Sequence, residues 1–351
     1  MTPARHSDPI QRKFLSGEEG VLERTLSGRK AWIISDGKVG NDVQSLGVAH
    51  ALGVDVTVKH VAPEGLHKLL SPWIGVARRE RFGDGDGQFA PPWPELAIAI
   101  GRLTTPYIRA LKTVAGERTF TVILQDPKVS LSTADLFWVP LHDRLRGRNV
   151  VTTLTAPHSF TEERLRTLAR TLPPYLAALP KPRIAITLGG ANGAYRYSPA
   201  ALQRLEGAIR AFGEKGASLM VTPSRRTAPS IVNSARKAAE PFPHFFWDMQ
   251  GDNPYPEFLA HADAFLAPAD SINMTGEPCA TGRPVYVFYP DGGSPKFMRF
   301  HTALEQHGAT RRMPDRLQTM DYWTYRPLNS AKTIAEEIDR RAGAAAHCRA
   351  G

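Results

Sequence analysis

The sequence predicts an α/β protein built from two facing Rossmann-like domains, and three observations predict this class. Apolar segments of strand length alternate with helical segments along 351 residues, a length that suits two domains of ordinary size. A proline-rich segment at residues 172–182 divides the alternation into two series. The first apolar segment of each series ends in a glycine-containing turn before a helix, as in βαβ units with parallel strands.

The first series begins with a strand at 31–35, a loop at 36–41 and a helix at 42–52 that Gly53 closes. Residues 71–94 are rich in Gly, Pro and polar side chains, and they predict a mobile loop. The remaining elements expected in this series are strands at 54–61 and 95–101, a helix at 105–115, and strands at 119–127, 134–141 and 149–155.

The second series follows the proline-rich segment directly. We expect an N-terminal domain at 29–175 and a C-terminal domain at 183–351, whose last helix could pack back on the N-terminal domain. Residues 1–28 lack an apolar core and are interpreted as a flexible leader. The expected elements of the second series are strand 183–189, helix 199–213, strand 218–224, helix 228–239, strand 244–248, helix 255–263, strands 264–268 and 284–290, and helix 330–342.

The chain is basic, with a formal net charge of +10 and a pI of about 9.7. This balance suits anionic partners such as nucleotide phosphates or acidic lipid headgroups, although solubility explains it equally well. Zinc-finger spacing and dense basic blocks with interleaved aromatics are both absent from the sequence, so nucleic acid is not an expected partner. The two cysteines, Cys279 and Cys348, fit a reducing compartment, and we interpret the protein as cytoplasmic.

Loops at the carboxyl ends of the strands are where open α/β sheets bind ligands. In the second series, arginines suit bidentate phosphate contacts, amides at a helix start attract anions, and a carboxylate can accept both hydroxyls of a ribose. Tight strand-to-helix packing and solvated loops explain the same residues without a ligand. The candidate nucleotide- and phosphate-binding residues are Gly189, Gly190, Asn192, Gly193, Ser224, Arg225, Arg226, Ser271, Asn273 and Glu277.

The first series offers candidate bases in its strand-end loops. An aspartate of these loops, or His142, could accept a proton if a cleft holds it, whereas turn or cap chemistry is the commoner role of such residues. We select Asp42 and Asp126 as catalytic candidates. The histidines are scattered and metal-ligand spacing is absent, so neither a metal nor a cofactor is expected. The other candidate residues of the N-terminal loop are Asp36, Gly37, Lys38 and Gly40.

Six motifs carry a resemblance to a known family: SDGKVGNDVQSLGVA, LQDPK, LGGANGAYRYS, TPSRRT, DNPYPEFLAHAD and DSINMTGEPCATGRPVYV. In this order they resemble the mitochondrial-fission "elongated mitochondria" family of plants and its bacterial homologues, over residues 29–340. That family is in turn similar to GT-B glycosyltransferases, such as the peptidoglycan transferase that uses UDP-GlcNAc, which implies a GT-B-like fold. The sequence departs from those transferases at Lys38 and Asp42, where they usually have a His, and at Pro278 after the acidic Glu277.

The resemblance implies two hypotheses about function. The first is a metal-independent GT-B glycosyltransferase whose C-terminal domain holds a nucleotide-sugar donor. Its acceptor would lie on the N-terminal domain, where the basic and apolar segment 71–82 could hold a lipid-linked acceptor at an anionic membrane. The alternative is a non-catalytic adaptor on a membrane surface that recruits a dynamin-like fission protein, because a fold alone licenses no activity. The resemblance implies the bacterial inner membrane, or the mitochondrial outer surface for a plant-type member, as that surface.

Overall fold

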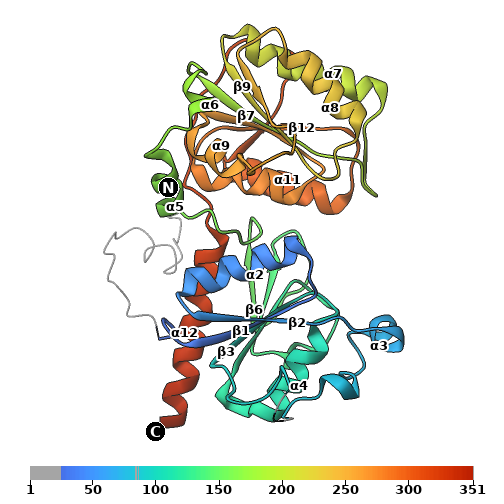
Figure 1. Ribbon diagram of the computed structural model, residues 1–351, viewed down its shortest axis with the longest axis vertical. Coiled ribbons are helices and arrows are strands. Elements are labelled where there is room, and N and C mark those ends of the chain that lie inside the picture. The colour runs from blue at the N-terminus through green and yellow to red at the C-terminus, as the bar shows by residue number, and fades with distance from the viewer. Residues whose placement is uncertain (1–24, 84, 86, 351) are drawn as a thin grey trace, which may run out of the picture.

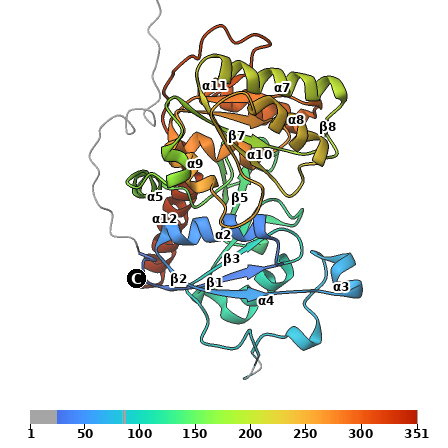
Figure 2. The same ribbon diagram turned by 45° about the horizontal axis from the view of Figure 1, so that its top comes forward.

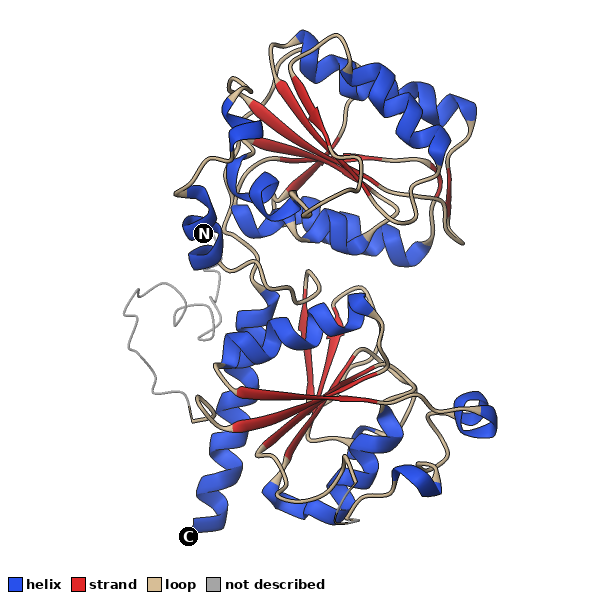
Figure 3. Cartoon of the chain, in the orientation of Figure 1, coloured by secondary structure: helices blue, strands red, loops and turns tan. Residues whose placement is uncertain are grey.

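The computed structural model describes residues 25–350 with the exception of 84 and 86. The predicted leader therefore lies outside the described residues up to position 24, and so does the side chain of Cys348. The described chain forms two α/β units, each a six-stranded sheet with helices on both faces (Figure 1 and Figure 3). The predicted fold class, two Rossmann-like units in one chain, is confirmed.

The N-terminal sheet has the strand order β2-β1-β3-β4-β5-β6, and its neighbouring strands run parallel. Its central strands are buried along their whole length, which explains why they read as continuous apolar runs rather than alternating ones. The strands are β1 Lys30–Ser35, β2 Asp55–His60, β3 Leu96–Ile100, β4 Phe120–Leu124, β5 Leu136–Pro140 and β6 Val150–Thr153, and the helices are α2 Val39–Leu52, α3 Gly65–Leu70 and α4 Thr105–Ala115.

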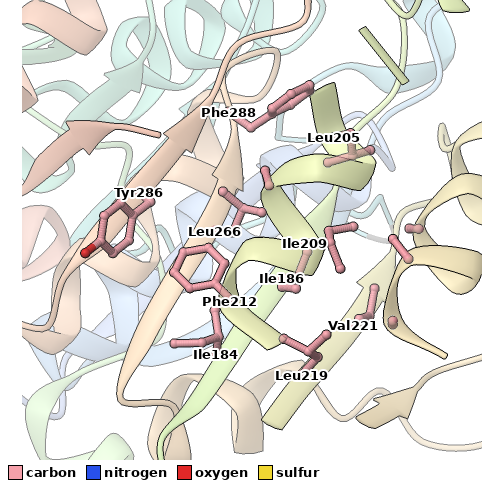
Figure 4. Close-up of a cluster of buried hydrophobic side chains, with 14 of the residues drawn as sticks. Ile184, Ile186, Leu205, Ile209, Phe212, Leu219, Val221, Leu266, Tyr286 and Phe288 are labelled. Carbon is pink, nitrogen blue, oxygen red and sulfur yellow. The ribbon is translucent and has the colours of Figure 1, made fainter. Parts of the chain in front are cut away.

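The C-terminal sheet has the order β10-β9-β7-β11-β12-β14, again parallel. Its main core lies between the sheet and α7, where Ile184, Ile186 and Phe212 pack together (Figure 4). The strands are β7 Arg183–Leu188, β9 Ser218–Pro223, β10 His244–Phe246, β11 Ala264–Pro268, β12 Val285–Phe288 and β14 Thr310–Arg312, with a small antiparallel pair β8 Tyr195–Arg196 and β13 Asp291–Gly292. The helices are α5 Glu162–Ala169, α6 Pro174–Ala177, α7 Pro199–Glu214, α8 Pro229–Ala239, α9 Tyr255–His261, α10 Ile272–Gly276 and α11 Pro295–Gln306.

The last helix, α12 Ser330–Ala350, leaves the C-terminal unit and lies along α2 of the N-terminal unit (Figure 1). Its Ile334 and Ile338 are fully buried in the N-terminal core. At its start, the Ser330 and Thr155 hydroxyls share a buried hydrogen bond of 2.6 Å. The end of the chain thus completes the core of the first domain. Neither α12 nor any other helix in the described part of the chain is long and apolar enough to span a membrane.

Several segments differ from the sequence predictions. Residues 71–94 were expected to be a mobile loop, but Phe89 is 1% exposed and stacks on Phe82 with a centroid distance of 4.4 Å. Phe89 also packs against Trp32 of β1, so aromatic burial fixes this part of the segment to the sheet. The short elements α3, α5, α6, β8, β13 and β14 were not predicted. A further unpredicted element is α11. Ser294 caps it, accepting from the Phe297 N–H, and Pro295 occupies its first turn.

Candidate functional site: the pocket between the two domains

A pocket of about 440 Å³ lies between the two domains. Its N-terminal wall comes from the loops that follow β4 and β5, together with Gln44 of α2. Its C-terminal wall comes from the starts of α10 and α11. The pocket therefore lies where a ligand of an open α/β sheet is expected, beyond the carboxyl ends of the strands. The lining residues used below are Gln44, Gln125, Asp126, Lys128, His142, Asp143, Arg144, Asn273, Lys296 and Arg299.

The loop after β4 enters the pocket with a strained backbone. Gln125 and Lys128 have φ values of 69° and 62°, in the left-handed region that side chains other than Gly and Asn rarely adopt. The loop is held by local bonds: the Gln125 N–H donates to the Trp138 carbonyl at 2.7 Å, and the Lys128 N–H donates to the Asp126 carboxylate at 2.8 Å. The Lys128 ammonium also pairs with Asp126. Strain held in place at a pocket wall is typical of binding loops.

His142 is the most unusual side chain of the pocket. It is 4% exposed, and neither ring nitrogen has a hydrogen-bond partner among the described residues. Its ring packs edge-on against Phe300 of α11 at a centroid distance of 5.4 Å. Burial lowers the pKa of His142 to about 4, and the nearby Lys296 and Arg299 act in the same direction while Asp143 opposes them. The imidazole is therefore neutral at physiological pH, and both of its ring nitrogens are buried without a hydrogen-bond partner among the described residues.

Cations of the C-terminal domain reach across to the loop that carries His142. The Lys296 ammonium lies 2.9 Å from the Asp143 carboxylate, and the Arg299 Nε donates to the His142 carbonyl at 2.9 Å. Arg144 is exposed at the same rim and forms no ion pair or hydrogen bond with another residue in the described part of the chain. In this lining Lys128, Arg144, Lys296 and Arg299 outnumber the carboxylates of Asp126 and Asp143. The pocket can therefore attract an anion.

The glycine-rich turn after β7 contains a buried acid instead of open space. A Cβ added to Gly189 would lie 2.2 Å from the Asp270 carboxylate, and one added to Gly190 would lie 2.1 Å from the Arg226 carbonyl oxygen. Asp270 is 2% exposed and accepts from the Gly190 N–H at 3.1 Å and from the Tyr197 hydroxyl at 2.6 Å. Burial raises the pKa of Asp270, and these bonds oppose the rise. Internal packing therefore explains the glycines at 189 and 190.

The remaining predicted residues of this region surround the same turn. The Asn192 amide donates to the Asp270 carbonyl at 2.9 Å, and a Cβ on Gly193 would meet nothing within 4 Å. Ser271 caps α10 by accepting from the Met274 N–H at 3.3 Å, while Asn273 lines the pocket. The Ser224 and Thr227 hydroxyls are 2.9 Å apart, Arg225 is exposed, and Arg226 lies 3.5 Å from the Asp270 carboxylate.

Glu277 follows α10 and is not among the residues that line the pocket, although its N–H donates to the carbonyl of Asn273, which does, at 2.8 Å. Burial raises the pKa of Glu277 to about 7, and the Tyr255 hydroxyl partly offsets this. The two groups interact without the geometry of a regular hydrogen bond, since the buried Tyr255 oxygen has no such partner among the described residues. α10 has only five residues, so at about 1.5 Å per residue Glu277 remains within about 10 Å of Ser271 along the helix.

The predicted N-terminal loop forms a compact hydrogen-bonded turn. Asp36 pairs with Lys38 and accepts from the Asn41 amide at 3.1 Å. Burial raises the pKa of Asp36, but Lys38 and Asn41 outweigh it and leave the pKa below its usual range. Asp42 accepts from the Ser35 hydroxyl, which in turn accepts from the Gly37 N–H at 2.9 Å. Asp36, Lys38, Gly40 and Asp42 are not among the residues that line the pocket, whereas Asp126 is.

The family is decided by a comparison that covers most of the chain. A model of the family described as "Mitochondrial fission ELM1" matches residues 39–342, which include strands of both sheets and the pocket between them. The chain belongs to the mitochondrial fission ELM1 family. The resemblance found in the six motifs is thereby confirmed.

This ELM1-family chain is similar to one protein from a plant and to one from a bacterium. It is 28% identical over 295 residues to the mitochondrial fission protein ELM1 of Arabidopsis thaliana, and the match covers 77% of this chain and 67% of the relative. It is 23% identical over 351 residues to an uncharacterised protein of Rickettsia prowazekii, and that match covers 88% of this chain and 97% of the relative.

Among solved structures, the ELM1-family chain is similar to the UDP-GlcNAc 2-epimerase of Methanocaldococcus jannaschii. The TM-score is 0.51 at 12% identity, and the match covers 89% of this chain and 98% of the epimerase. At this identity the likeness shows the fold alone. The ELM1-family chain therefore has the GT-B fold that its motifs predicted.

Several pocket residues were not selected from the sequence. Lys296 and Arg299 were missed because α11 was missed, although the Ser-Pro start and the apolar spacing of 294–306 are helix signals. Lys128 stands in the motif LQDPK without being a candidate residue, and His142 is named in the sequence analysis only as a possible base. Sequence patterns show which residues end a strand, but not which of them meet a second domain.

Proposed function

We propose that this ELM1-family protein is a GT-B-type glycosyltransferase that binds a nucleoside diphosphate sugar in the pocket between its domains. The observation that carries the proposal is the pairing of a neutral, unpartnered His142 with a predominantly cationic pocket wall. A diphosphate leaving group needs positive charge near its oxygens, and positioned arginine and lysine side chains can supply that charge without a metal. The same wall would keep the group oriented while the bond breaks.

In the proposed reaction, a hydroxyl oxygen of the acceptor attacks the anomeric carbon of the sugar. The bond from that carbon to the diphosphate oxygen breaks, and the nucleoside diphosphate leaves with the bonding electrons. The acceptor proton passes to a base in the pocket. Lys296, Arg299 and Arg144 would stabilise the charge that develops on the diphosphate.

Three side chains are candidates for the base, and their surroundings rank them. Asp42 is hydrogen-bonded to Ser35 and does not line the pocket. Asp126 lines the pocket, but its carboxylate is already engaged by the ammonium and the main-chain N–H of Lys128. His142 is neutral and has no competing partner among the described residues. We favour His142, whose low pKa would rise when the anionic donor binds beside it.

The donor-binding residues remain a proposal. Glu277 would accept the ribose hydroxyls, with Ser271, Asn273, Arg225 and Arg226 near the phosphates, as the resemblance implies. The buried Asp270 carboxylate argues against a phosphate immediately beside Gly189 and Gly190, because two negative charges would repel each other there. The remaining approach is past Gly193 and Asn273, towards the pocket between the domains.

The first experiment measures donor binding. Thermal unfolding would be followed with UDP, UDP-GlcNAc and other nucleotide-sugars, because a ligand of the native state raises the melting temperature by mass action. We expect Arg144→Ala to weaken binding about tenfold, since it removes one charged contact to the phosphates. Arg316→Ala, which removes another exposed arginine, one outside the pocket, is the matched control and should bind normally. No shift with any nucleotide at millimolar concentration would refute the proposal.

The second experiment separates transfer from other chemistry. Release of free nucleoside diphosphate from a nucleotide-sugar, measured with a coupled assay, reports transfer to an acceptor or to water. We expect His142→Gln to lose this activity while retaining donor binding, and Asp126→Asn to lose less. A change of sugar configuration without nucleotide release would indicate epimerisation instead. Equal losses in the His142 and Asp126 variants would contradict the choice of base.

The alternative function is a non-catalytic adaptor at a membrane surface that recruits a dynamin-like protein. The similarity to the Arabidopsis relative, a mitochondrial fission protein, is the observation that favours it. An adaptor needs no donor, so the absence of nucleotide binding, together with direct binding to a purified dynamin-like protein, would support the adaptor over the enzyme.

A further inference from the structure

An exposed apolar patch stands on the N-terminal domain, apart from the pocket. It consists of Leu66, Leu69 and Leu70 on the short helix α3 and Trp73 just after it, whose exposed fractions are 68%, 69%, 43% and 65%. No residue of α3 is buried. Both views show α3 projecting from the side of the domain (Figure 1 and Figure 2). The other large apolar side chains exposed in the described part of the chain occur singly along the sequence.

Such a patch is unfavourable in water unless something covers it. A six-residue helix has little stability of its own, and a contiguous apolar surface usually marks an interaction site. Two hydrogen bonds hold the main chain just after α3. The Arg102 guanidinium donates to the Ser71 carbonyl at 2.8 Å, and the Arg109 guanidinium donates to the Pro72 carbonyl at 2.9 Å. They anchor the segment that leads to Trp73.

Basic and hydroxyl groups lie directly beside the patch. A hollow of about 670 Å³ is lined by Trp73 itself, by Arg109, Lys112 and Lys128, and by hydroxyl side chains such as Ser130. Lys112 and Lys128 form ion pairs with Asp135 and Asp126, which do not line the hollow, whereas Arg109 pairs with no carboxylate in the described part of the chain. Lys68 adds an exposed cation on α3. Apolar side chains that project outward, with cations at their base, match the order of acyl chains and phosphates at the surface of an anionic bilayer.

We propose that α3 and Trp73 insert into the headgroup region of an anionic bilayer, and that the hollow beside them takes the phosphate of a lipid headgroup. Trp73 suits this depth because its ring is apolar and its N–H is polar. Lys128 lines both this hollow and the pocket between the domains, so the membrane contact adjoins that pocket. This inference is independent of the proposed sugar transfer, since an adaptor could use the same surface.

The test is co-sedimentation of the full chain with vesicles. We expect binding to vesicles of phosphatidylcholine mixed with phosphatidylglycerol, much weaker binding to phosphatidylcholine alone, and release at high salt. Leu69→Gln combined with Trp73→Gln should lower partitioning by at least about tenfold, because it removes most of the inserted apolar surface. Lys68→Gln should lower it by about fivefold, the effect of one basic residue near an anionic surface.

Matched controls come from the other domain. Met298→Gln removes a side chain of similar exposure, 67%, on α11, and Lys215→Gln removes an exposed lysine after α7; both should bind vesicles like the unmodified chain. Thermal unfolding should be unchanged in every variant, because none of the substituted side chains is buried. The proposal is overturned if the unmodified chain stays in the supernatant with anionic vesicles at low salt, or if the Leu69 and Trp73 double variant sediments as well as the controls.

Discussion

At the residue scale, the position of Asp270 helps to explain why residues 189 and 190 are glycines. The carboxylate sits under the turn and accepts from a main-chain N–H and a tyrosine hydroxyl, so the end of β7 is tied to the end of β11. A side chain at either glycine would collide with this arrangement. A protein carboxylate thus occupies the place beside this turn where the sequence suggested a phosphate.

Gly189→Ala should be strongly destabilising for that reason. The new Cβ would meet the Asp270 carboxylate at 2.2 Å, and the buried acid can move only by losing its hydrogen bonds. We expect a loss of about 3 kcal/mol or more in urea unfolding, as for overpacking combined with a broken buried network. Gly193→Ala is the control, because its Cβ meets nothing within 4 Å, and it should change stability little. Equal stabilities of the two variants would rule out the packing explanation.

Glu277 should lower the stability of the native state at neutral pH. Its pKa is raised to about 7 in the folded chain from an ordinary value of 4.5, so the folded state binds the proton more tightly than the unfolded state. Stability is then unaffected below pH 4.5, falls as the pH rises towards 7 and stays lower above it. Glu277→Gln should therefore raise the free energy of unfolding at pH 8 by up to about 3 kcal/mol and change it little at pH 4.

Urea unfolding at the two pH values is the measurement for Glu277. Glu214→Gln, at the exposed end of α7, is the control and should show no such pH dependence. A Glu277 variant that is less stable than the unmodified chain at pH 8 would contradict the raised pKa. An acid that costs stability and lies near a strand-end site is typical of a residue retained for function.

At the scale of elements, α11 and α12 determine much of the molecule beyond what strand patterns predict. α11 brings Lys296 and Arg299 to the loop after β5, and it places Phe300 against His142. α12 closes the N-terminal core with side chains from the end of the sequence. Both helices act through contacts that local patterns do not encode.

Ile338→Ala tests the role of α12. Ile338 is fully buried in the N-terminal core, so its truncation leaves a cavity and should cost about 2–5 kcal/mol. Lys332→Ala, on the exposed side of the same helix, should stay within about 0.5 kcal/mol of the unmodified chain. Chemical denaturation followed by far-UV circular dichroism measures both. If the Ile338 variant unfolds like the Lys332 variant, α12 does not contribute to that core in solution.

At the scale of the whole molecule, the candidate site exists only where the two domains meet. The Arg299 to His142 bond joins residues 157 positions apart, and the Lys296 to Asp143 pair lies beside it. These contacts place a cationic helix start over the strand ends of the other domain. Neither domain alone would form the pocket, because its lining is shared between them.

The sequence by itself determined the two-domain α/β class, nearly all central strands and the family. These follow from local properties of the sequence: apolar runs of strand length, glycines and prolines that mark turns and loops, and short motifs that resemble those of a known family. Asp126 and Asn273 could also be selected, because residues that end strands or start helices in such sheets tend to face ligands.

Only the tertiary structure decided which strand-end residues share the pocket, why residues 189 and 190 must be glycines, and which side chains of α12 enter the N-terminal core. Each of these depends on groups far apart in the chain that burial and hydrogen bonding bring together, such as Asp270 beneath Gly190 at a separation of 80 residues. A pattern of residue types records a local conformational preference. It does not show which distant side chain lies next to it in the folded chain. His142, Lys296 and Arg299 line the pocket together because the tertiary structure brings them to one place.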